Sequence, residues 1–202
     1  MWQVRLTSLA GTLAKVLCRA LNCNGSNALI TIGGVDSAML PLGLLRSVVC
    51  VVPQAASVGD GGATVRTVID PAMHLDEQAV WQALTLVGMQ RTVAATNKGL
   101  DEPVDSGRWS AGEIQLLVLA RAVVRQPLVM ILDESSAHLD DTAAECVRDL
   151  LRYGECFDRT TVIVIAHRLM DVGACDRVLY APLSLPSASL SLKCYRTAVL
   201  FT

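Results

Sequence analysis

Apolar residues recur along the chain with two different spacings. A spacing near 3.6 residues, typical of amphipathic helices, predicts four helices, at about residues 8–21, 76–88, 110–125 and 141–153. Short continuous apolar runs rich in β-branched residues predict four strands, at residues 28–32, 47–52, 128–132 and 160–166. Strands of this kind, alternating with helices in the second half of the chain, are typical of a parallel sheet buried on both faces. The pattern therefore predicts an α/β fold.

Polar residues come within two positions of the ends of three of the predicted strands. Asp133 and Glu134 follow one strand, and Gln54 and His167 follow two others. The carboxyl ends of parallel strands meet at one edge of a sheet, where ligands of such folds bind, so we expect these side chains to share a site. A lone Asp-Glu pair is also typical of a solvated turn, and the neighbouring motifs must decide between the two interpretations.

The helix predicted at residues 110–125 begins with an S-x-x-E sequence, Ser110 to Glu113. Such a capping box satisfies two free backbone amides at a helix start. The start also contains Gly112, and free amides together with the helix dipole make helix starts suitable for binding anions. The sequence is therefore compatible with two interpretations of this helix start, a structural cap and a phosphate-binding site. If Ser110 is only a cap, Ser110→Asp should be tolerated, because Asp caps as well as Ser.

Composition limits the classes of function. With 202 residues, 52% of them hydrophobic, the chain can bury one full core. Lys and Arg number 17 against 19 Asp and Glu, so no basic field indicates nucleic acid or an anionic lipid as a partner. Every long apolar run is interrupted by polar residues or Gly, and we expect no membrane-spanning segment in this chain. Seven scattered cysteines without a CxxC pair indicate reduced thiols that fill the core.

The first 23 residues carry three basic residues and no acid. This composition also fits an amphipathic mitochondrial presequence, which we keep as an alternative interpretation.

The order of the motifs is more specific than any one of them. They are, in sequence, LGLLRSVVCVVPQ at 42–54, WSAGEIQLLVLARAVV at 109–124, LVMILDESSAHLD at 128–140 and TVIVIAHRL at 161–169. This set resembles the ATP-binding cassette of ABC transporters, particularly the C subfamily, the multidrug-resistance-associated type. The segments look like the Q-loop, the signature motif, the Walker B motif with its D-loop, and the H-loop. The resemblance covers roughly residues 6–180.

The resemblance implies a fold and two cofactors. The fold is a P-loop NTPase-like ABC ATPase core around a parallel sheet, incomplete at the N-terminus, with a helical signature subdomain at about residues 70–125. We expect this partial nucleotide-binding domain at residues 1–180 and a divergent tail at residues 181–202. The cofactors are ATP and Mg²⁺.

The resemblance also implies a role for each candidate residue. Asp133 would hold Mg²⁺, generally through water, while Glu134 polarises the attacking water and His167 contacts the γ-phosphate. Gln54 would sense metal and nucleotide. The remaining candidates are Thr7, in the P-loop Ser/Thr position next to the metal, and Ser110 with Gly112, which would face the phosphate of a partner cassette.

Three features depart from the family pattern. A P-loop needs G-x-x-x-x-G-K-[ST], yet if Thr7 takes the last position, Leu6 and Arg5 stand where the Lys and second Gly belong. The signature L-S-G-G-Q carries Ala111 and Glu113 at its third and fifth positions. After Tyr180, the tail is expected to lack the closing strands and helices of the family. These departures predict that the isolated chain is inactive.

The sequence thus predicts the cassette portion of an ABC transporter, in which ATP binding and hydrolysis are coupled to solute export. Its partners would be a second nucleotide-binding domain and the transmembrane domains, at the cytoplasmic face of a membrane. One alternative is an ABC-like interaction module that docks on a transporter without turnover. Another is a gene fragment that completes no active site.

Overall fold

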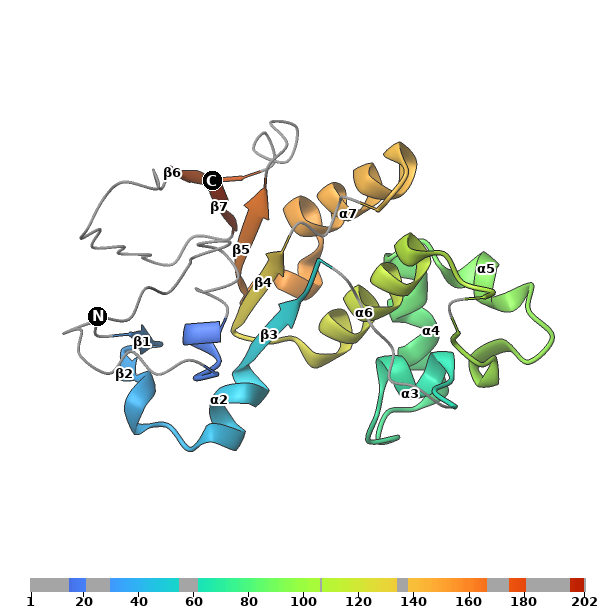
Figure 1. Ribbon diagram of the computed structural model, residues 1–202, viewed down its shortest axis with the longest axis horizontal. Coiled ribbons are helices and arrows are strands. Elements are labelled where there is room, and N and C mark those ends of the chain that lie inside the picture. The colour runs from blue at the N-terminus through green and yellow to red at the C-terminus, as the bar shows by residue number, and fades with distance from the viewer. Residues whose placement is uncertain are drawn as a thin grey trace, which may run out of the picture.

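The computed structural model describes residues 15–20, 30–54, 62–105, 107–133, 138–166, 175–180 and 197–201. Its centre is a five-stranded sheet in the order β3-β4-β5-β7-β6, in which every pair of neighbouring strands is parallel. The strands are β3 (Val49–Val52), β4 (Val129–Asp133), β5 (Thr161–Ala166), β6 (Arg177–Tyr180) and β7 (Thr197–Phe201). The predicted parallel α/β fold is therefore confirmed (Figure 1).

The central strands are buried on both faces, as their continuous apolar runs predict. Along β4, Met130 and Leu132 belong to one hydrophobic cluster, while Ile131 between them belongs to another. The strand β5 alternates in the same way, with Val162 and Val164 on one side and Ile163 and Ile165 on the other. Side chains of a strand point alternately to opposite faces, so the two clusters form two cores, one on each face of the sheet.

Two helices connect the central strands and cover one face. Helix α6 (Ala111–Arg125) leads into β4, and α7 (Asp141–Tyr153) connects β4 to β5. Ser110 is the N-cap of α6, as the sequence predicts, and Asp140 is the N-cap of α7. The Asp140 carboxylate accepts a hydrogen bond of 2.7 Å from the Ala143 amide. Strand, helix and parallel strand thus form a crossover unit that puts the ends of β4 and β5 side by side.

A helical region packs against α6 on the side away from the sheet. It contains α3 (Val65–Ile69), α4 (Glu77–Leu86), α5 (Gln90–Ala94) and the short 3-10 helix η2 (Gly99–Asp101). Helices α3 and α4 contact α6 directly. A salt bridge of 2.6 Å from Arg108 to the buried Glu102 fixes the loop that leads to α6. The helix predicted at residues 76–88 is α4, and Figure 1 shows it beside α6.

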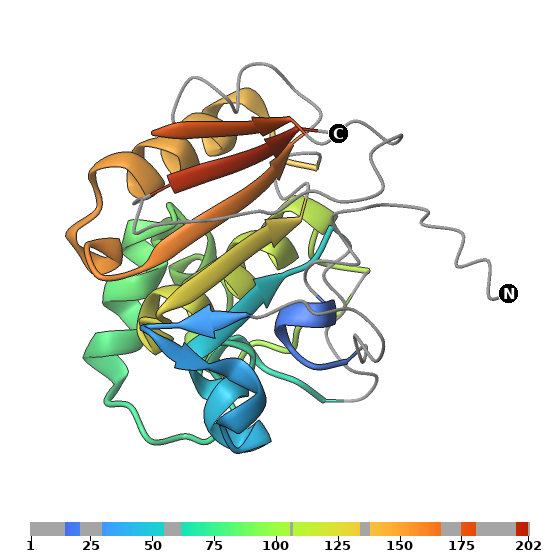
Figure 2. The same ribbon diagram turned by 90° about the vertical axis from the view of Figure 1, so that its left-hand side faces the viewer.

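The N-terminal elements cover the other face of the sheet (Figure 2). They are β1 (Thr31–Ile32), β2 (Val35–Asp36), the 3-10 helix η1 (Ser37–Met39) and α2 (Leu42–Val48). The Arg19 guanidinium, at the end of a helical turn at residues 15–17, donates to the Leu40 carbonyl over 3.0 Å. Leu45 of α2 reaches the second hydrophobic cluster, so this segment contributes to the core.

Two predictions for the N-terminal part need correction. The described part of the strand predicted at residues 28–32 is β1, which pairs with β2 in a separate antiparallel hairpin rather than joining the parallel sheet. The reason is the pair Gly33 and Gly34, whose positive φ angles of 60° and 83° allow a two-residue turn. The strand predicted at 47–52 begins only at Val49, because the preceding residues end α2. Of the helix predicted at 8–21, only residues 15–20 are described.

The expectation that the tail lacks closing strands is wrong for residues 197–201. These residues form β7, which lies inside the sheet between β5 and β6. Apolar residues in the sequence T-A-V-L-F suit a central parallel strand, a signal that the Ser- and Leu-rich composition of the preceding residues obscures.

Within the part of the chain that the structure describes, no helix combines the length and the apolar character needed to cross a membrane.

Candidate functional site

The carboxyl ends of β3, β4 and β5 lie side by side. The register pairs Val52 with Leu132, and Asp133 with Ile165. Asp133 is therefore the last residue of the middle strand of these three and is partly buried. Gln54 follows β3 by two residues and is exposed at the same edge. The structure thus places these two candidate residues at the edge that the sequence predicts.

The other three candidates from this constellation are Thr7, Glu134 and His167, and they lie outside the described residues. Glu134 directly follows β4 in the sequence, and His167 directly follows β5. Their roles stay predictions.

The start of α6 forms the complete capping box. Ser110 Oγ accepts a hydrogen bond of 3.2 Å from the Glu113 amide, and the Ser110 amide donates to Glu113 Oε2 over 2.8 Å. The Ser110 hydroxyl also donates to the same carboxylate oxygen over 2.8 Å. Both side chains are thus occupied with each other and with the helix start. This geometry provides a full structural reason for Ser110 and Glu113, whether or not a phosphate binds there.

Gly112 has its own packing requirement. A Cβ atom at this position would lie 2.6 Å from the His138 carbonyl oxygen, closer than side chains tolerate. The start of α6 therefore lies directly against the backbone of the segment that follows β4. A glycine is needed here for close packing, as well as for any approach of an anion to the helix start.

Gln115 connects α6 to the end of β3. Its side chain is 2% exposed, and Nε2 donates a hydrogen bond of 3.2 Å to the Pro53 carbonyl, directly before Gln54. The Gln115 Oε1 atom is buried and has no hydrogen-bond partner within the described structure. Gln115 was not among the candidate residues predicted from the sequence. The available signal was a polar residue on the otherwise apolar face of an amphipathic helix.

Trp109, the first residue of the segment that resembles the signature motif, is a second anchor. Its ring is 4% exposed, and its Nε1 donates to the Pro103 carbonyl over 2.9 Å. Trp109 precedes the N-cap and joins the same hydrophobic cluster as Ile114, four residues into the helix. An apolar pair at these two positions fixes the angle at which the chain enters a helix.

The donor chemistry at the strand edge suits a hard cation. Asp133 supplies a carboxylate and Gln54 an amide oxygen, and these oxygen ligands are of the kind that Mg²⁺ prefers. Because β3 and β4 are neighbours in register, both residues extend from adjacent strand ends. The donor types of these two residues therefore suit the metal that the sequence predicts, and the metal site itself stays a prediction.

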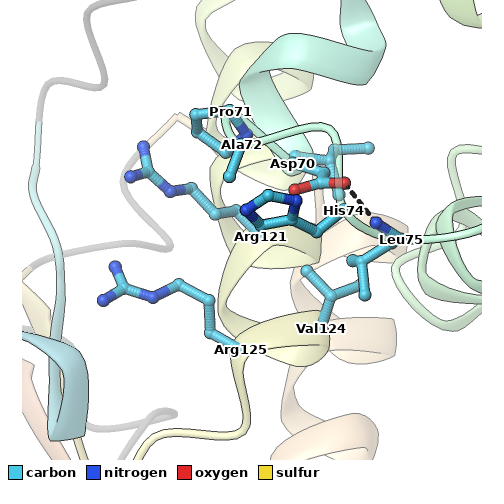
Figure 3. Close-up of a pocket in the computed structure, with 9 residues that line it drawn as sticks. Asp70, Pro71, Ala72, His74, Leu75, Arg121, Val124 and Arg125 are labelled. Carbon is cyan, nitrogen blue, oxygen red and sulfur yellow. Dashed lines mark hydrogen bonds between the residues drawn. The ribbon is translucent and has the colours of Figure 1, made fainter.

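A separate pocket lies at the other end of α6. It has a volume of about 340 Å³ and is lined by the loop after α3 and by the last turns of α6 (Figure 3). The guanidinium groups of Arg121 and Arg125 extend from α6 on one side, and the Asp70 carboxylate accepts a hydrogen bond of 2.7 Å from the Leu75 amide. Arg125 also donates to the Arg46 carbonyl over 2.8 Å, near the amino end of β3. The pocket is therefore remote from the strand ends that carry Asp133 and Gln54.

Cys50, the second residue of β3, has a buried thiol whose surroundings disfavour the thiolate form. Burial raises the pKa of Cys50 above the ordinary thiol value, and the nearby Arg125 and Arg121 offset only part of this effect. A thiol with a raised pKa carries little thiolate at neutral pH and is a poor nucleophile. Cys50 therefore serves the packing of the strand and not the chemistry of the site.

Comparison with known proteins defines the class. A family model described as ABC transporter matches residues 11–137. The ATP-binding cassette transporter abc1 of Schizosaccharomyces pombe is 36% identical over 160 residues, which cover 74% of this chain and 11% of that protein. A bacterial Atm1-family ABC exporter with ATP bound matches 80% of the chain and 28% of its own length, with 25% identity and a TM-score of 0.71. The chain belongs to the ABC transporter family and forms an ATP-binding domain of that family.

The subfamily follows from other relatives. ABC transporter C family member 13 of Oryza sativa is 31% identical over 177 residues, 87% of this chain. ABC transporter C family member 5 of Arabidopsis thaliana is likewise 31% identical over 177 residues. The predicted C subfamily is confirmed. The chain spans about 11% of the length of these relatives.

Proposed function

We propose that this chain is the nucleotide-binding portion of a C-type ABC exporter, in which ATP binding and hydrolysis are coupled to solute export. The observation that carries the proposal is the position of Asp133 at the carboxyl end of β4, in a parallel sheet, beside the end of β3 with Gln54. The partners in this proposal are a second nucleotide-binding domain and transmembrane domains, and the location is the cytoplasmic face of a membrane.

Each residue takes one task at the proposed site. Asp133, Gln54 and Thr7 would hold Mg²⁺, which when bound supplies positive charge to the phosphate oxygens. Glu134 accepts a proton from the attacking water, and its place after Asp133 separates metal binding from base chemistry. His167, after the neighbouring strand, donates a hydrogen bond to the γ-phosphate.

Ser110 and Gly112 act toward a second cassette in this proposal. They would offer a hydroxyl and a backbone amide to the phosphate of an ATP that the partner holds. The Ser110 hydroxyl already donates to Glu113 Oε2, so it must turn away from that carboxylate to reach a phosphate. This competition weakens the signature site of the chain relative to one with a Gln at position 113.

The 202 residues contain no G-x-x-x-x-G-K-[ST] sequence. Backbone amides and the Lys of that motif hold the phosphates, and each charge-assisted bond contributes about 1.5–3 kcal/mol. Three such bonds correspond to at least three orders of magnitude in affinity. We therefore propose that residues 1–202 alone neither bind Mg-ATP tightly nor hydrolyse it.

A second candidate is a non-catalytic interaction module that docks on a transporter or a sister cassette. The mutual hydrogen bonds of Ser110 and Glu113 favour it, because they engage the signature hydroxyl with a side chain of its own helix. The two functions differ in one measurable property, which is turnover after the P-loop is restored.

The test uses calorimetric titration of Mg-ATP and a phosphate-release assay. Residues 1–202 should give a dissociation constant weaker than about 1 mM. A second chain carries an apolar strand and G-x-x-x-x-G-K directly before Thr7, and we expect it to bind and hydrolyse ATP. In that chain, Glu134→Gln should keep binding and abolish turnover, since an amide cannot act as a base. The matched control is Glu145→Gln on the exposed surface of α7, which should keep both.

Two results would contradict the proposal. Micromolar binding by residues 1–202 would show that the P-loop is not needed. Unchanged turnover in the Glu134→Gln variant would remove Glu134 from its proposed role.

A further inference from the structure

The strands β5 and β6 follow each other along the chain, yet they are not neighbours in the sheet. Between them lies β7, from the last described residues (Figure 2). The register pairs β7 with β5 from Val162↔Thr197 to Ala166↔Phe201, and with β6 from Arg177↔Ala198 to Tyr180↔Phe201. Both edges of β7 are therefore hydrogen-bonded, and the strand is an interior one.

The position between β5 and β6 cannot stay open. Neighbouring strands lie about 4.8 Å apart, so a missing strand would leave a gap across which β5 and β6 cannot bond. Each would expose a row of unpaired amides and carbonyls in the middle of the sheet. Some strand must occupy this position for the sheet to be continuous. In this chain the strand at this position is β7, which follows both of its neighbours in the sequence.

The geometry of the proposed site indicates which kind of strand belongs between β5 and β6. This step rests on the proposed function. A P-loop follows a strand, and its amides must reach phosphates shared with Asp133 and with the residue after β5. Both edges of β4 are already occupied, by β3 and β5. A strand outside β3 would be separated from β5 by two strands, β3 and β4. The free side of β5 is therefore where a P-loop strand has to pair, and β7 lies there.

We propose that residues 197–201 act as a surrogate strand that occupies the position of a P-loop strand, completes the sheet and excludes a P-loop strand from pairing between β5 and β6. The segment suits this role because T-A-V-L-F is apolar and rich in strand-forming residues. Sixteen residues, 181–196, connect it to β6. A parallel crossover needs about a dozen residues, so the connection is long enough.

The first experiment is hydrogen exchange on the full chain. Amides of residues 198–201 should be protected to the same degree as those of β5. Exchange of these amides at the rate of an unstructured peptide would overturn the proposal. This measurement needs no variant and cannot be lost to misfolding.

A matched pair of proline variants then tests pairing on both sides. Ala198→Pro removes the amide of the second residue of β7. We expect it to lower protection in residues 161–166 and 177–180 by at least about tenfold. Ala188→Pro makes the same change ten residues earlier, in a segment that already contains Pro182 and Pro186, and should leave protection unchanged. Equal protection of β5 and β6 in both variants and the parent chain would overturn the proposal.

The second experiment tests exclusion with the chain that carries an added strand and P-loop before Thr7. There the added strand and β7 compete for one position, so deleting residues 197–202 should tighten Mg-ATP binding by at least about tenfold. The same deletion without the added strand should expose β5 to exchange. Equal ATP affinity with and without residues 197–202 would overturn the surrogate role. Absence of ATP binding in both extended chains would instead overturn the proposed function, and the exchange measurements would still decide where β7 lies.

Discussion

The two halves of the sheet, β3-β4-β5 and β7-β6, differ in how the order of their strands relates to the order of the chain. On one side, β3, β4 and β5 follow in the order of the chain, with α6 and α7 as connections. On the other side, β7 comes last in the chain and enters between two earlier strands. The first side carries Gln54 and Asp133, and the second completes the sheet next to β5.

This difference shows that two kinds of information shape the sheet. The strands β4 and β5 have continuous apolar runs that contribute to both cores, so burial favours their central position. The strand β7 pairs with both β5 and β6, and in the proposal above it supplies the hydrogen-bonding partners that these two strands need. Variants that place a charge in the buried part of β4 should therefore lower the free energy of unfolding most. Variants that remove a single polar anchor should lower it less.

The largest effect is expected for a charge in the centre of β4. Ile131 is fully buried, and Ile131→Asp would place an unpaired carboxylate in the core. We expect a loss of more than about 4 kcal/mol in the free energy of unfolding, enough to unfold many domains. Leu128→Asp, one residue before the same strand at a side chain 47% exposed, should cost less than about 0.5 kcal/mol. Urea denaturation followed by circular dichroism measures both free energies of unfolding. Equal losses in the two variants would show that Ile131 is not more buried than Leu128.

A smaller effect is expected at the anchor between α6 and β3. Gln115→Ala removes the donor to the Pro53 carbonyl and should cost about 1–3 kcal/mol of unfolding free energy. The matched control is Gln78→Ala on the exposed side of α4, which should change stability by less than about 0.5 kcal/mol. Thermal melting of both variants checks this, and an unchanged melting temperature for Gln115→Ala would mean that the hydrogen bond contributes nothing to stability.

The cap of α6 should contribute about 1 kcal/mol. Ser110→Ala loses the acceptor for the Glu113 amide, whereas Ser47→Ala, at an exposed hydroxyl within α2, should have little effect. The expectation that Ser110→Asp is tolerated changes with the structure, since Ser110 Oγ lies 2.8 Å from Glu113 Oε2 and an Asp would face that carboxylate. Ser110→Asp should therefore be stable only together with Glu113→Gln. A double-mutant cycle by urea denaturation measures the coupling, and additive effects would contradict the contact.

The smallest effect is expected for Glu113→Gln alone. Gln still completes a capping box, but the variant loses a negative charge near the helix start, which should cost about 0.3–1 kcal/mol. If Glu113 also hinders the signature site, the same variant should strengthen ATP-dependent association with an intact cassette. Analytical ultracentrifugation with and without ATP measures this, and unchanged association would leave the capping box as the whole role of the pair.

The central part of the fold could be predicted because its signals are local. The helix predicted at 141–153 has those bounds in the structure, and α6 begins directly after the predicted cap Ser110. The position of Asp133 at a strand end followed from the apolar run before it. By contrast, Gln115 was not predicted as an anchor, because its partner Pro53 lies 62 residues away in the sequence.

The α/β class, the strands β4 and β5, the capping box of α6 and the family can all be predicted from the sequence, because periodicity, caps and ordered motifs depend on residues close together in the chain. Three features appear only once the chain is folded: Gly112 packs against the His138 backbone, Gln115 bonds the end of β3, and β7 lies between β5 and β6. Each of them depends on a backbone group from a distant segment, and backbone groups find their hydrogen-bonding partners by proximity in space and not by order along the chain.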